Sequence, residues 1–309
     1  MLLRGRVFPY HLITHHPSLI TFAFLLVAPR LSAQSLYEQA QGARQRNQLD
    51  SAYDLIQRAA EAEPNRAEVQ FLLGRIACDK AQSAGAFSAF GLARKCRAGF
   101  GRAVELAPDS TLYLEAFAQY LSQAPGIVGG DKDSAMKLVE VVRARDDVRG
   151  AFLLAGLLRE GNAASKARAD SAVEAVGRAH PAERSVQLSV ANWWSGTGRG
   201  ERALALWEAL VSRDPKDAVA RFFVGRQLVL LKRELPRAQE HLRFAAAATV
   251  PALSSGVQTF VPGAPWYRLG QSYVQLGMSD SARICFERAL RVNPQLQGAR
   301  LALDSLTHH

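Results

Sequence analysis

The sequence predicts an all-α protein, and three observations support that prediction. Of the 309 residues, 48% are apolar, which is enough for one or two domains with a real core. Alanine is abundant and runs of β-branched residues are scarce, a composition that favours helices over strands. Apolar residues also recur at spacings of three and four, which is the period of one helix face.

The helical period is clearest between residues 266 and 294. Two sets of residues each share one predicted face, namely Trp266, Leu269, Gly270 and Tyr273, and then Ala282, Phe286 and Ala289. Between them we expect Gly277 to stop the first helix and Asp280 to cap the second, and Pro294 to end the unit. The stretch is therefore predicted to be a pair of helices joined by a turn.

This pair resembles the tetratricopeptide repeat, a helix–turn–helix unit of about 34 residues. The resemblance rests on the residues just named, which match nearly every signature position of the repeat. It implies an α-solenoid wound as a right-handed superhelix. In the same register the chain carries about seven repeats and a cap helix over 296–306. The repeats lie near residues 33–66, 67–110, 111–149, 150–183, 184–217, 218–251 and 263–296.

Two insertions interrupt this register. The first spans residues 79–95 and carries Phe87, Phe90 and Leu92. Because apolar side chains in a loop are expected to be buried, we predict that this segment folds back on the solenoid. The second spans residues 122–134 and is rich in glycine. Both insertions resemble those of a subgroup of exported bacterial tetratricopeptide proteins, which implies export and fold but no chemistry.

The glycine-rich insertion invites a comparison with phosphate-binding loops. No Gly-Lys-Ser/Thr follows it, and Asp131 and Asp133 would repel a phosphate. We interpret these aspartates as caps of a helix that begins near Ser134.

Residues 1–33 are predicted to be a secretory signal peptide, so that the solenoid would span 34–309. Arg4 and Arg6 precede an apolar run from Leu19 to Ala28, and a small-residue site predicts cleavage after Ala33. The run is shorter than the ~20 residues that span a bilayer. An uncleaved anchor is the alternative. We expect the mature chain in the periplasm or cell envelope, without a membrane span.

The chain contains three cysteines, Cys78, Cys96 and Cys285. A single bridge between Cys78 and Cys96 is one interpretation, compatible with export. We favour the other, in which Cys96 and Cys285 are small apolar fillers on their helices.

The net charge of +10 suits partners with acidic or carboxylate groups. The alternative is a solvated basic shell. No run of Lys or Arg is dense enough to predict nucleic-acid binding.

In solenoids of the family that this chain resembles, the first helices of the repeats line a concave groove. The positions that would face it carry amide and guanidinium groups in one column and aromatic rings in another, which suits an extended peptide or a terminal carboxylate. The predicted partner-binding residues are Tyr37, Gln41, Phe71, Arg75, Gln119, Asn192, Phe222, Arg226, Tyr267 and Gln271. Alternatively, these side chains face neighbouring repeats or solvent.

No catalytic constellation is present in the sequence, so we predict a protein that is not an enzyme and uses no cofactor or metal. His180 precedes Pro181 at an expected helix end, and His241 is expected on a helix surface. We predict a scaffold that binds a peptide or a partner subunit in its groove. The alternative is a structural subunit of an envelope complex that uses its convex face or its insertions.

Overall fold

Every regular element in the part of the chain that the computed structural model describes, residues 36–248 and 260–307, is a helix. The prediction of an all-α fold is therefore confirmed. The expected signal peptide and most of the segment 251–262 lie outside the described residues. The chain divides into two units, Met1–Asp146 and Asp147–His309, called unit 1 and unit 2 below.

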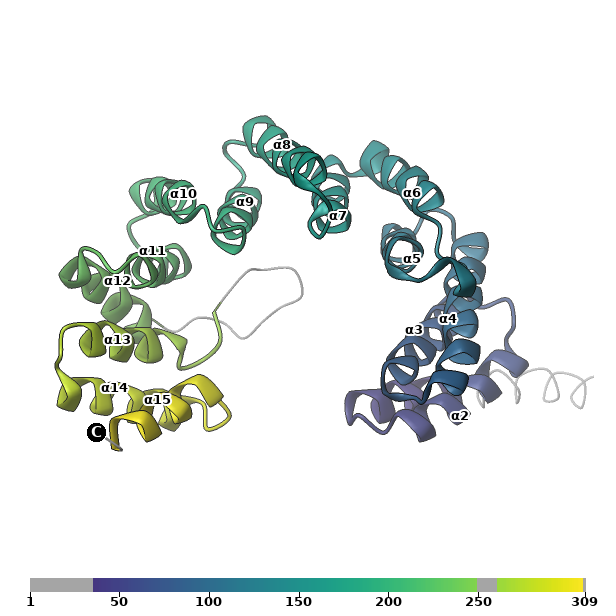
Figure 1. The fold of residues 1–309 in the computed structure, drawn as a ribbon, viewed down its shortest axis with the longest axis horizontal. Coiled ribbons are helices and arrows are strands. Elements are labelled where there is room, and N and C mark those ends of the chain that lie inside the picture. The colour runs from purple at the N-terminus through teal and green to yellow at the C-terminus, as the bar shows by residue number, and fades with distance from the viewer. Residues whose placement is uncertain (1–35, 249–259, 308–309) are drawn as a thin grey trace, which may run out of the picture. The chain divides into compact units, whose positions relative to one another are not determined.

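Unit 1 consists of consecutive helices that pack against their neighbours (Figure 1). Residues 36–45 form its first described helix. The others are α2 (Leu49–Ala62), α3 (Ala67–Ser83), α4 (Ala86–Leu106), α5 (Thr111–Gln123), the short 3₁₀ helix η1 (Gly126–Val128) and α6 (Lys132–Arg145).

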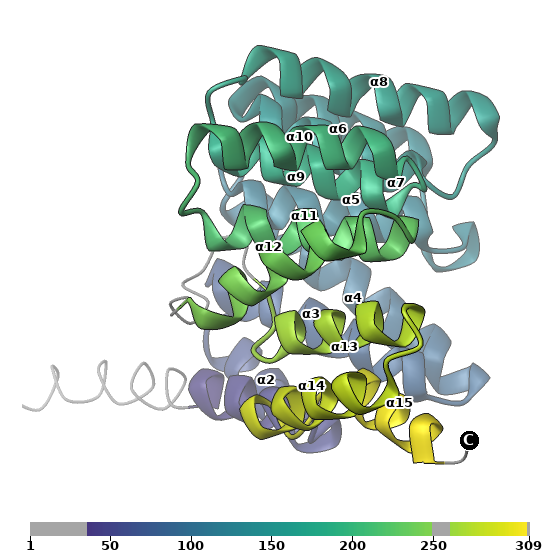
Figure 2. The same cartoon turned by 90° about the vertical axis from the view of Figure 1, so that its left-hand side faces the viewer.

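Unit 2 follows the same plan, and its successive helices lie side by side (Figure 2). They are α7 (Asp147–Leu158), α8 (Ala163–Ala179), α9 (Arg184–Gly196), α10 (Gly200–Arg213), α11 (Ala218–Leu231), α12 (Leu235–Ala247), α13 (Ala264–Gln275), α14 (Ser279–Val292) and α15 (Gln297–Thr307). Besides its neighbour α12, α11 also contacts α13.

Small residues set the closest approach of paired helices. A Cβ atom on Gly270 of α13 would lie 2.4 Å from Cε1 of Phe286 in α14, so only glycine fits there. In the pair α3–α4, a Cβ on Gly99 would lie 2.6 Å from the backbone nitrogen of Gly74. Such contacts bring the helix axes close enough for the large side chains beside them to interlock.

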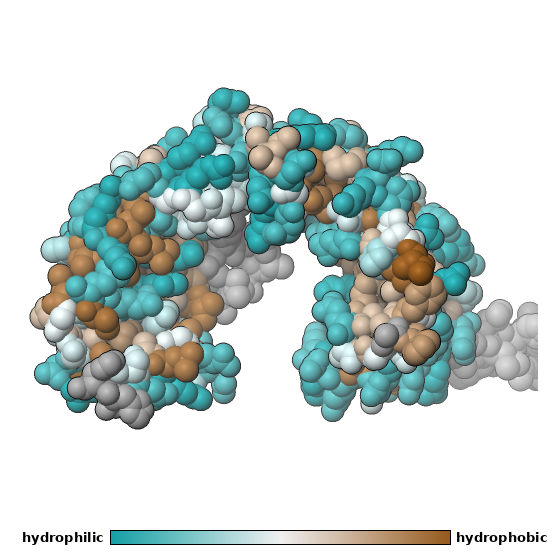
Figure 3. Space-filling model, in the orientation of Figure 1, coloured by the Kyte–Doolittle hydropathy of each residue, from teal (hydrophilic) through white to brown (hydrophobic). Residues whose placement is uncertain are grey.

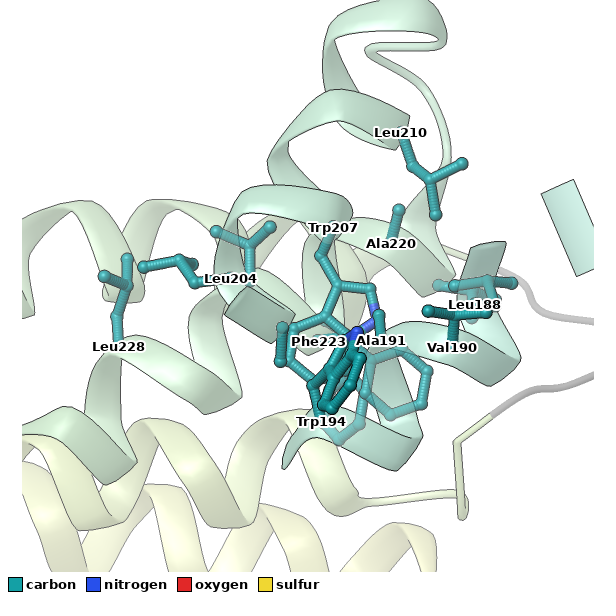
Figure 4. Packing of buried hydrophobic residues seen from close by; sticks show 14 of the residues in the cluster. Leu188, Val190, Ala191, Trp194, Leu204, Trp207, Leu210, Ala220, Phe223 and Leu228 are labelled. Carbon is teal, nitrogen blue, oxygen red and sulfur yellow. The ribbon is translucent and has the colours of Figure 1, made fainter. Parts of the chain in front are cut away.

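The core of unit 2 is built around aromatic side chains. Trp194, Trp207 and Phe223 point toward one another (Figure 4), and the rings of Trp207 and Phe223 stack with centroids 5.2 Å apart. Trp207 is fully buried. Aromatic stacks of this kind bury large areas in one place, which holds three successive helices together.

Several turn and cap predictions are confirmed, and one is wrong. Gly277 ends α13 with a φ of +72°, and Asp131 caps α6 by accepting hydrogen bonds from the amides of Asp133 and Ser134. Asp280 is not a cap, because α14 begins before it; its carboxylate pairs with Arg283 in the first turn.

The first insertion corrects a prediction. Residues 79–95 do not fold back as a loop, because they lengthen α3 and α4 and leave a short turn between them. Leu92 is buried as expected, but Phe87 is 99% exposed and Phe90 lies mostly at the surface.

The favoured interpretation of the cysteines is also corrected. Cys78 of α3 and Cys96 of α4 form a disulfide, with Cα atoms 5.2 Å apart, so Cys96 is not a free apolar filler. Cys285 is buried and unpaired, as predicted.

The two histidines lie in different surroundings. His180 ends α8 as expected, and its ring nitrogens lie 2.9 Å from a carboxylate oxygen of Asp147 and 2.6 Å from one of Glu183. His241 is buried, contrary to prediction, because α12 packs against both α11 and α13 and therefore has two covered faces. Burial, with the charges of Arg221 and Arg237, lowers the pKa of His241.

Candidate interaction cleft

A cleft of about 540 Å³ opens in unit 1 among α3, α4, α5 and η1. Apolar and aromatic side chains form much of its wall, with polar groups among them. The lining residues are Arg44, Phe71, Arg75, Cys78, Asp79, Ala81, Gln82, Ala93, Phe100, Leu112, Glu115, Ala116, Gln119, Tyr120, Gln123, Ala124, Pro125 and Val128. Apolar surface over α3–α5 faces the viewer in Figure 3, with hydrophilic surface around it.

The first insertion builds one wall of this cleft. The added turns of α3 and α4 supply Asp79, Ala81, Gln82 and Ala93 to its lining. The disulfide between Cys78 and Cys96 joins these two helices where the insertion begins and ends. A covalent link here fixes the spacing of helices that would otherwise be held by packing alone.

The second insertion supplies another part of the cleft wall, and Tyr120 holds it against α4. The Tyr120 hydroxyl lies 2.7 Å from the carbonyl oxygen of Ala93 and 2.8 Å from that of Val128, so it can donate to either. Arg97 donates from Nε to the Gly129 carbonyl, 3.1 Å away. Gly129 has a φ of +89°, which favours glycine. Burial raises the pKa of Tyr120, so its hydroxyl stays protonated and able to donate.

One cation in the cleft, Arg75, forms no ion pair within the described residues, although the carboxylate of Asp79 lies near enough to act on it. Arg44 pairs with Asp79, with 2.7 Å between Nε and Oδ2. Among the described residues Arg75 forms no ion pair, and its guanidinium lies 5.7 Å from the ring centroid of Phe71. Burial first, and then the charge of Arg44, lowers the pKa of Arg75. Arg75 is therefore the cleft's available cation, beside an aromatic wall.

Three of the predicted binding residues, Phe71, Arg75 and Gln119, meet in this cleft. Phe71 is largely buried against Phe100 and Tyr113, so it offers an edge to the cleft. Tyr37 and Gln41 belong to the same unit but do not line it. Tyr37 lies under the guanidinium of Arg66, and Gln41 is exposed.

The other predicted residues lie in unit 2. Asn192 lines a smaller cleft of about 330 Å³ beside Trp193. Phe222 is in the core, with its ring 4.6 Å from that of Phe260. Arg226, Tyr267 and Gln271 are half-buried on α11 and α13.

Sequence reasoning missed three lining residues, namely Gln82 and Gln123 from the insertions and Tyr120 from α5 just before the second insertion. They fall outside the columns of the repeat, so no repeat position points to them. The insertions themselves could have indicated Gln82 and Gln123, since segments inserted into a regular repeat array often form its binding surface.

The described residues contain no group of three or more His, Cys, Asp or Glu side chains that could hold a metal ion. Within the same ranges, none of the helices combines the length and the apolarity needed to cross a bilayer.

Comparison with known proteins gives one sequence match and several matches in fold. Residues 263–296 match the tetratricopeptide repeat model. No curated protein matches the chain. A tetratricopeptide repeat protein from Parabacteroides merdae is similar in structure, with a TM-score of 0.52 and 13% identity, over 90% of this chain and 100% of that one. The human IFIT1 dimer with m7Gppp-AAAA is also similar, with a TM-score of 0.50 and 15% identity, over 84% of this chain and 58% of that one.

These likenesses are in fold, since the identities are low. Within the described residues, successive helices pack against one another as in an α-solenoid, and side chains of several helices line a cleft. Residues 263–296 thus match one tetratricopeptide repeat, and the fold of the chain is similar to that of a tetratricopeptide repeat protein.

Proposed function

We propose that the protein is an exported scaffold that binds a peptide segment or a partner subunit in the cleft of unit 1. The observation that carries the proposal is the cleft itself, because both insertions, the disulfide and the buried Tyr120 hydroxyl combine to form its walls. Both insertions add residues to the regular repeats, and the Cys78–Cys96 disulfide and the Tyr120 hydroxyl hold them in place. This arrangement supports a binding role.

The chemistry of the walls suits an extended peptide. Phe71, Leu112 and Pro125 offer apolar contact, and the amides of Gln82, Gln119 and Gln123 can hydrogen-bond a backbone. Arg75 adds a cation for an acidic side chain or a terminal carboxylate of the partner.

Cleft binding can be tested by photo-crosslinking in cells. A photoreactive residue at position 119 should trap a defined partner, whereas one at the exposed position 61 of α2 should not. Arg75→Glu should weaken the interaction by about tenfold, because it places a negative charge against the partner. Arg58→Glu, an equal charge change on exposed α2, is the matched control. Equal trapping from positions 119 and 61 would argue against the cleft.

Export is supported by the disulfide, since such bonds persist in oxidising compartments. Cell fractionation and the mass of the mature chain test it. We expect an N-terminus at Gln34 in the envelope fraction; a full-length cytosolic chain with reduced Cys78 and Cys96 would contradict it.

A second candidate function, a structural subunit docked through the insertions, has its own support. Phe87 is 99% exposed at the start of α4, and Ile127 is exposed in η1. Apolar side chains left in water on added segments are typical of contact points. Under this alternative Phe87→Ser would abolish assembly while Arg75→Glu would not.

A further inference from the structure

One side of α4, called its outer face below, is exposed to solvent and begins with two aromatic rings. Phe87 is 99% exposed and Phe90 is 39% exposed. Spacings of three and then four residues place Phe87, Phe90 and Arg94 on this same face. The buried residues on the opposite side of the helix are Leu92, Cys96, Gly99, Phe100 and Ala103. Apolar rings left in water are costly in free energy, so a pair of them on one face indicates a binding surface.

Three cations lie on this face or at its edges. Arg94, Lys95 and Arg97 are all exposed, and within the described residues none of them forms an ion pair. The segments 1–35, 249–259 and 308–309 contain no Asp or Glu, so they supply no acidic side chain either. The guanidinium carbon of Arg94 lies 5.9 Å from the ring centroid of Phe90. At 1.5 Å per residue, the rings and cations occupy about 15 Å of the helix.

The sequence around the outer face contains no acidic residue. Between Asp79 and Glu105 the chain has five Lys or Arg and no Asp or Glu. The two cations at the ends of this stretch have partners, since Lys80 pairs with Asp50 and Arg102 pairs with Glu105. The first turn of α4 has neither an acidic residue nor a side-chain cap, so the partial positive charge of the helix end adds to that of the cations.

This combination suits an anionic lipid surface better than another protein. Aromatic side chains enter the interface of a bilayer, while Lys and Arg beside them are attracted to anionic lipid head groups. A stable protein interface instead buries about 800 Å² on each partner, around an apolar core that is poor in charged residues. On the outer face the apolar part consists of two rings, and the exposed cations lie directly beside them.

We propose that the outer face of α4 binds the surface of an anionic membrane. The rings of Phe87 and Phe90 enter the lipid interface, and the three cations contact the lipid phosphates. The helix lies against the bilayer and does not cross it. Neither ring lines the cleft of unit 1, so this surface does not depend on the function proposed for that cleft.

Flotation of the purified chain with lipid vesicles tests this surface without any protein partner. Vesicles that contain phosphatidylglycerol should bind the chain at least about tenfold more tightly than vesicles of phosphatidylcholine alone, because the cations act only on an anionic surface. Phe87→Ser/Phe90→Ser should lose about tenfold or more in affinity, since the inserted apolar area is removed. Arg94→Gln/Lys95→Gln should lose about as much through the lost charge.

Control variants elsewhere in unit 1 distinguish the outer face from general charge and apolarity. Arg58→Gln/Arg143→Gln removes two exposed cations from α2 and α6, and Val141→Ser removes an exposed apolar side chain from α6. Each control should change the affinity by less than about threefold, because these side chains lie away from α4 and salt screens distant charges. Circular dichroism checks that every variant folds.

Photo-crosslinking in cells identifies what covers the outer face in place. A photoreactive residue at position 87 should form adducts with lipid, whereas one at position 141 should not. A protein adduct at position 87 without a lipid adduct would assign the face to a partner subunit and overturn the proposal. The proposal is also overturned if no vesicle binds, if neutral vesicles bind as tightly as anionic ones, or if the control variants lose as much affinity as the variants in α4.

Discussion

Gly270 and Gly156 are both helical glycines, but their surroundings differ. A methyl group on Gly270 would collide with the Phe286 ring, whereas one on Gly156 of α7 would meet nothing within 4 Å. We predict that Gly270→Ala destabilises the protein by about 1–3 kcal/mol through overpacking. Gly156→Ala should instead stabilise it by up to about 1 kcal/mol, since alanine favours helices. Urea unfolding measures both, and equal effects would contradict this packing.

His180 gives a pH dependence with a definite sign. Its hydrogen bonds to Asp147 and Glu183 raise its pKa above the ordinary 6.5, so the folded state prefers the protonated ring. The stabilisation is therefore fully present below the ordinary pKa and disappears as the pH rises through the folded-state value. The stability difference between the unaltered chain and His180→Gln should be larger at pH 5.5 than at pH 8.5. A difference that grows toward alkaline pH would contradict this assignment.

At the scale of the element, the start of α11 depends on one carboxylate. Asp217 accepts hydrogen bonds from the amides of Val219 and Ala220, and it pairs with Arg184 of α9. Burial alone would raise the pKa of Asp217, but the bonds from Arg184 and the amides outweigh it and hold the pKa below its usual range.

We predict that Asp217→Ala costs about 2–3 kcal/mol, because it removes a cap and leaves Arg184 without its partner. Asp214→Ala, an equal charge change at an exposed neighbour, should stay within about 0.5 kcal/mol. Thermal melts compare them. Similar losses in both variants would mean that charge, and not the cap, is responsible.

The elements also show which structural features could be predicted from sequence. The period of three and four, with Gly277 as a stop, identified α13 and α14 because apolar spacing reflects burial on one face. It could not show that His241 is buried, since α12 has two covered faces. It also could not show that Asp280 lies inside the first turn of α14, because the helix begins one residue before it, at Ser279.

Residues 79–95 were mispredicted for a related reason. Alanine-rich additions can extend two paired helices as readily as they form a loop, and a single sequence does not distinguish the outcomes. Phe71, Arg75 and Gln119 of the cleft were predictable from repeat columns. Gln82, Gln123 and Tyr120 were not, because their role arises from contacts between segments far apart in sequence. The number of repeats and the hand of the superhelix remain predictions.

At the scale of the whole molecule, the two units should respond differently to reduction. The disulfide closes a loop with a sequence separation of 18 residues within unit 1, and unit 2 contains no disulfide among its described residues. Its loss should destabilise unit 1 by roughly 3 kcal/mol. Hydrogen exchange with and without a dithiol should show faster exchange in α3 and α4 but not in α9–α14. Uniform loss of protection across both units would contradict the division.

The burial of Cys285 affects how the disulfide between Cys78 and Cys96 forms. Three thiols allow three pairings during oxidation, and two of those pairings involve Cys285. Once α14 has docked, this thiol is covered and burial raises its pKa, so little reactive thiolate remains. If unit 2 folds first, the Cys285 thiol is no longer available for pairing. Cys78 and Cys96 would then form their disulfide without help from an isomerase.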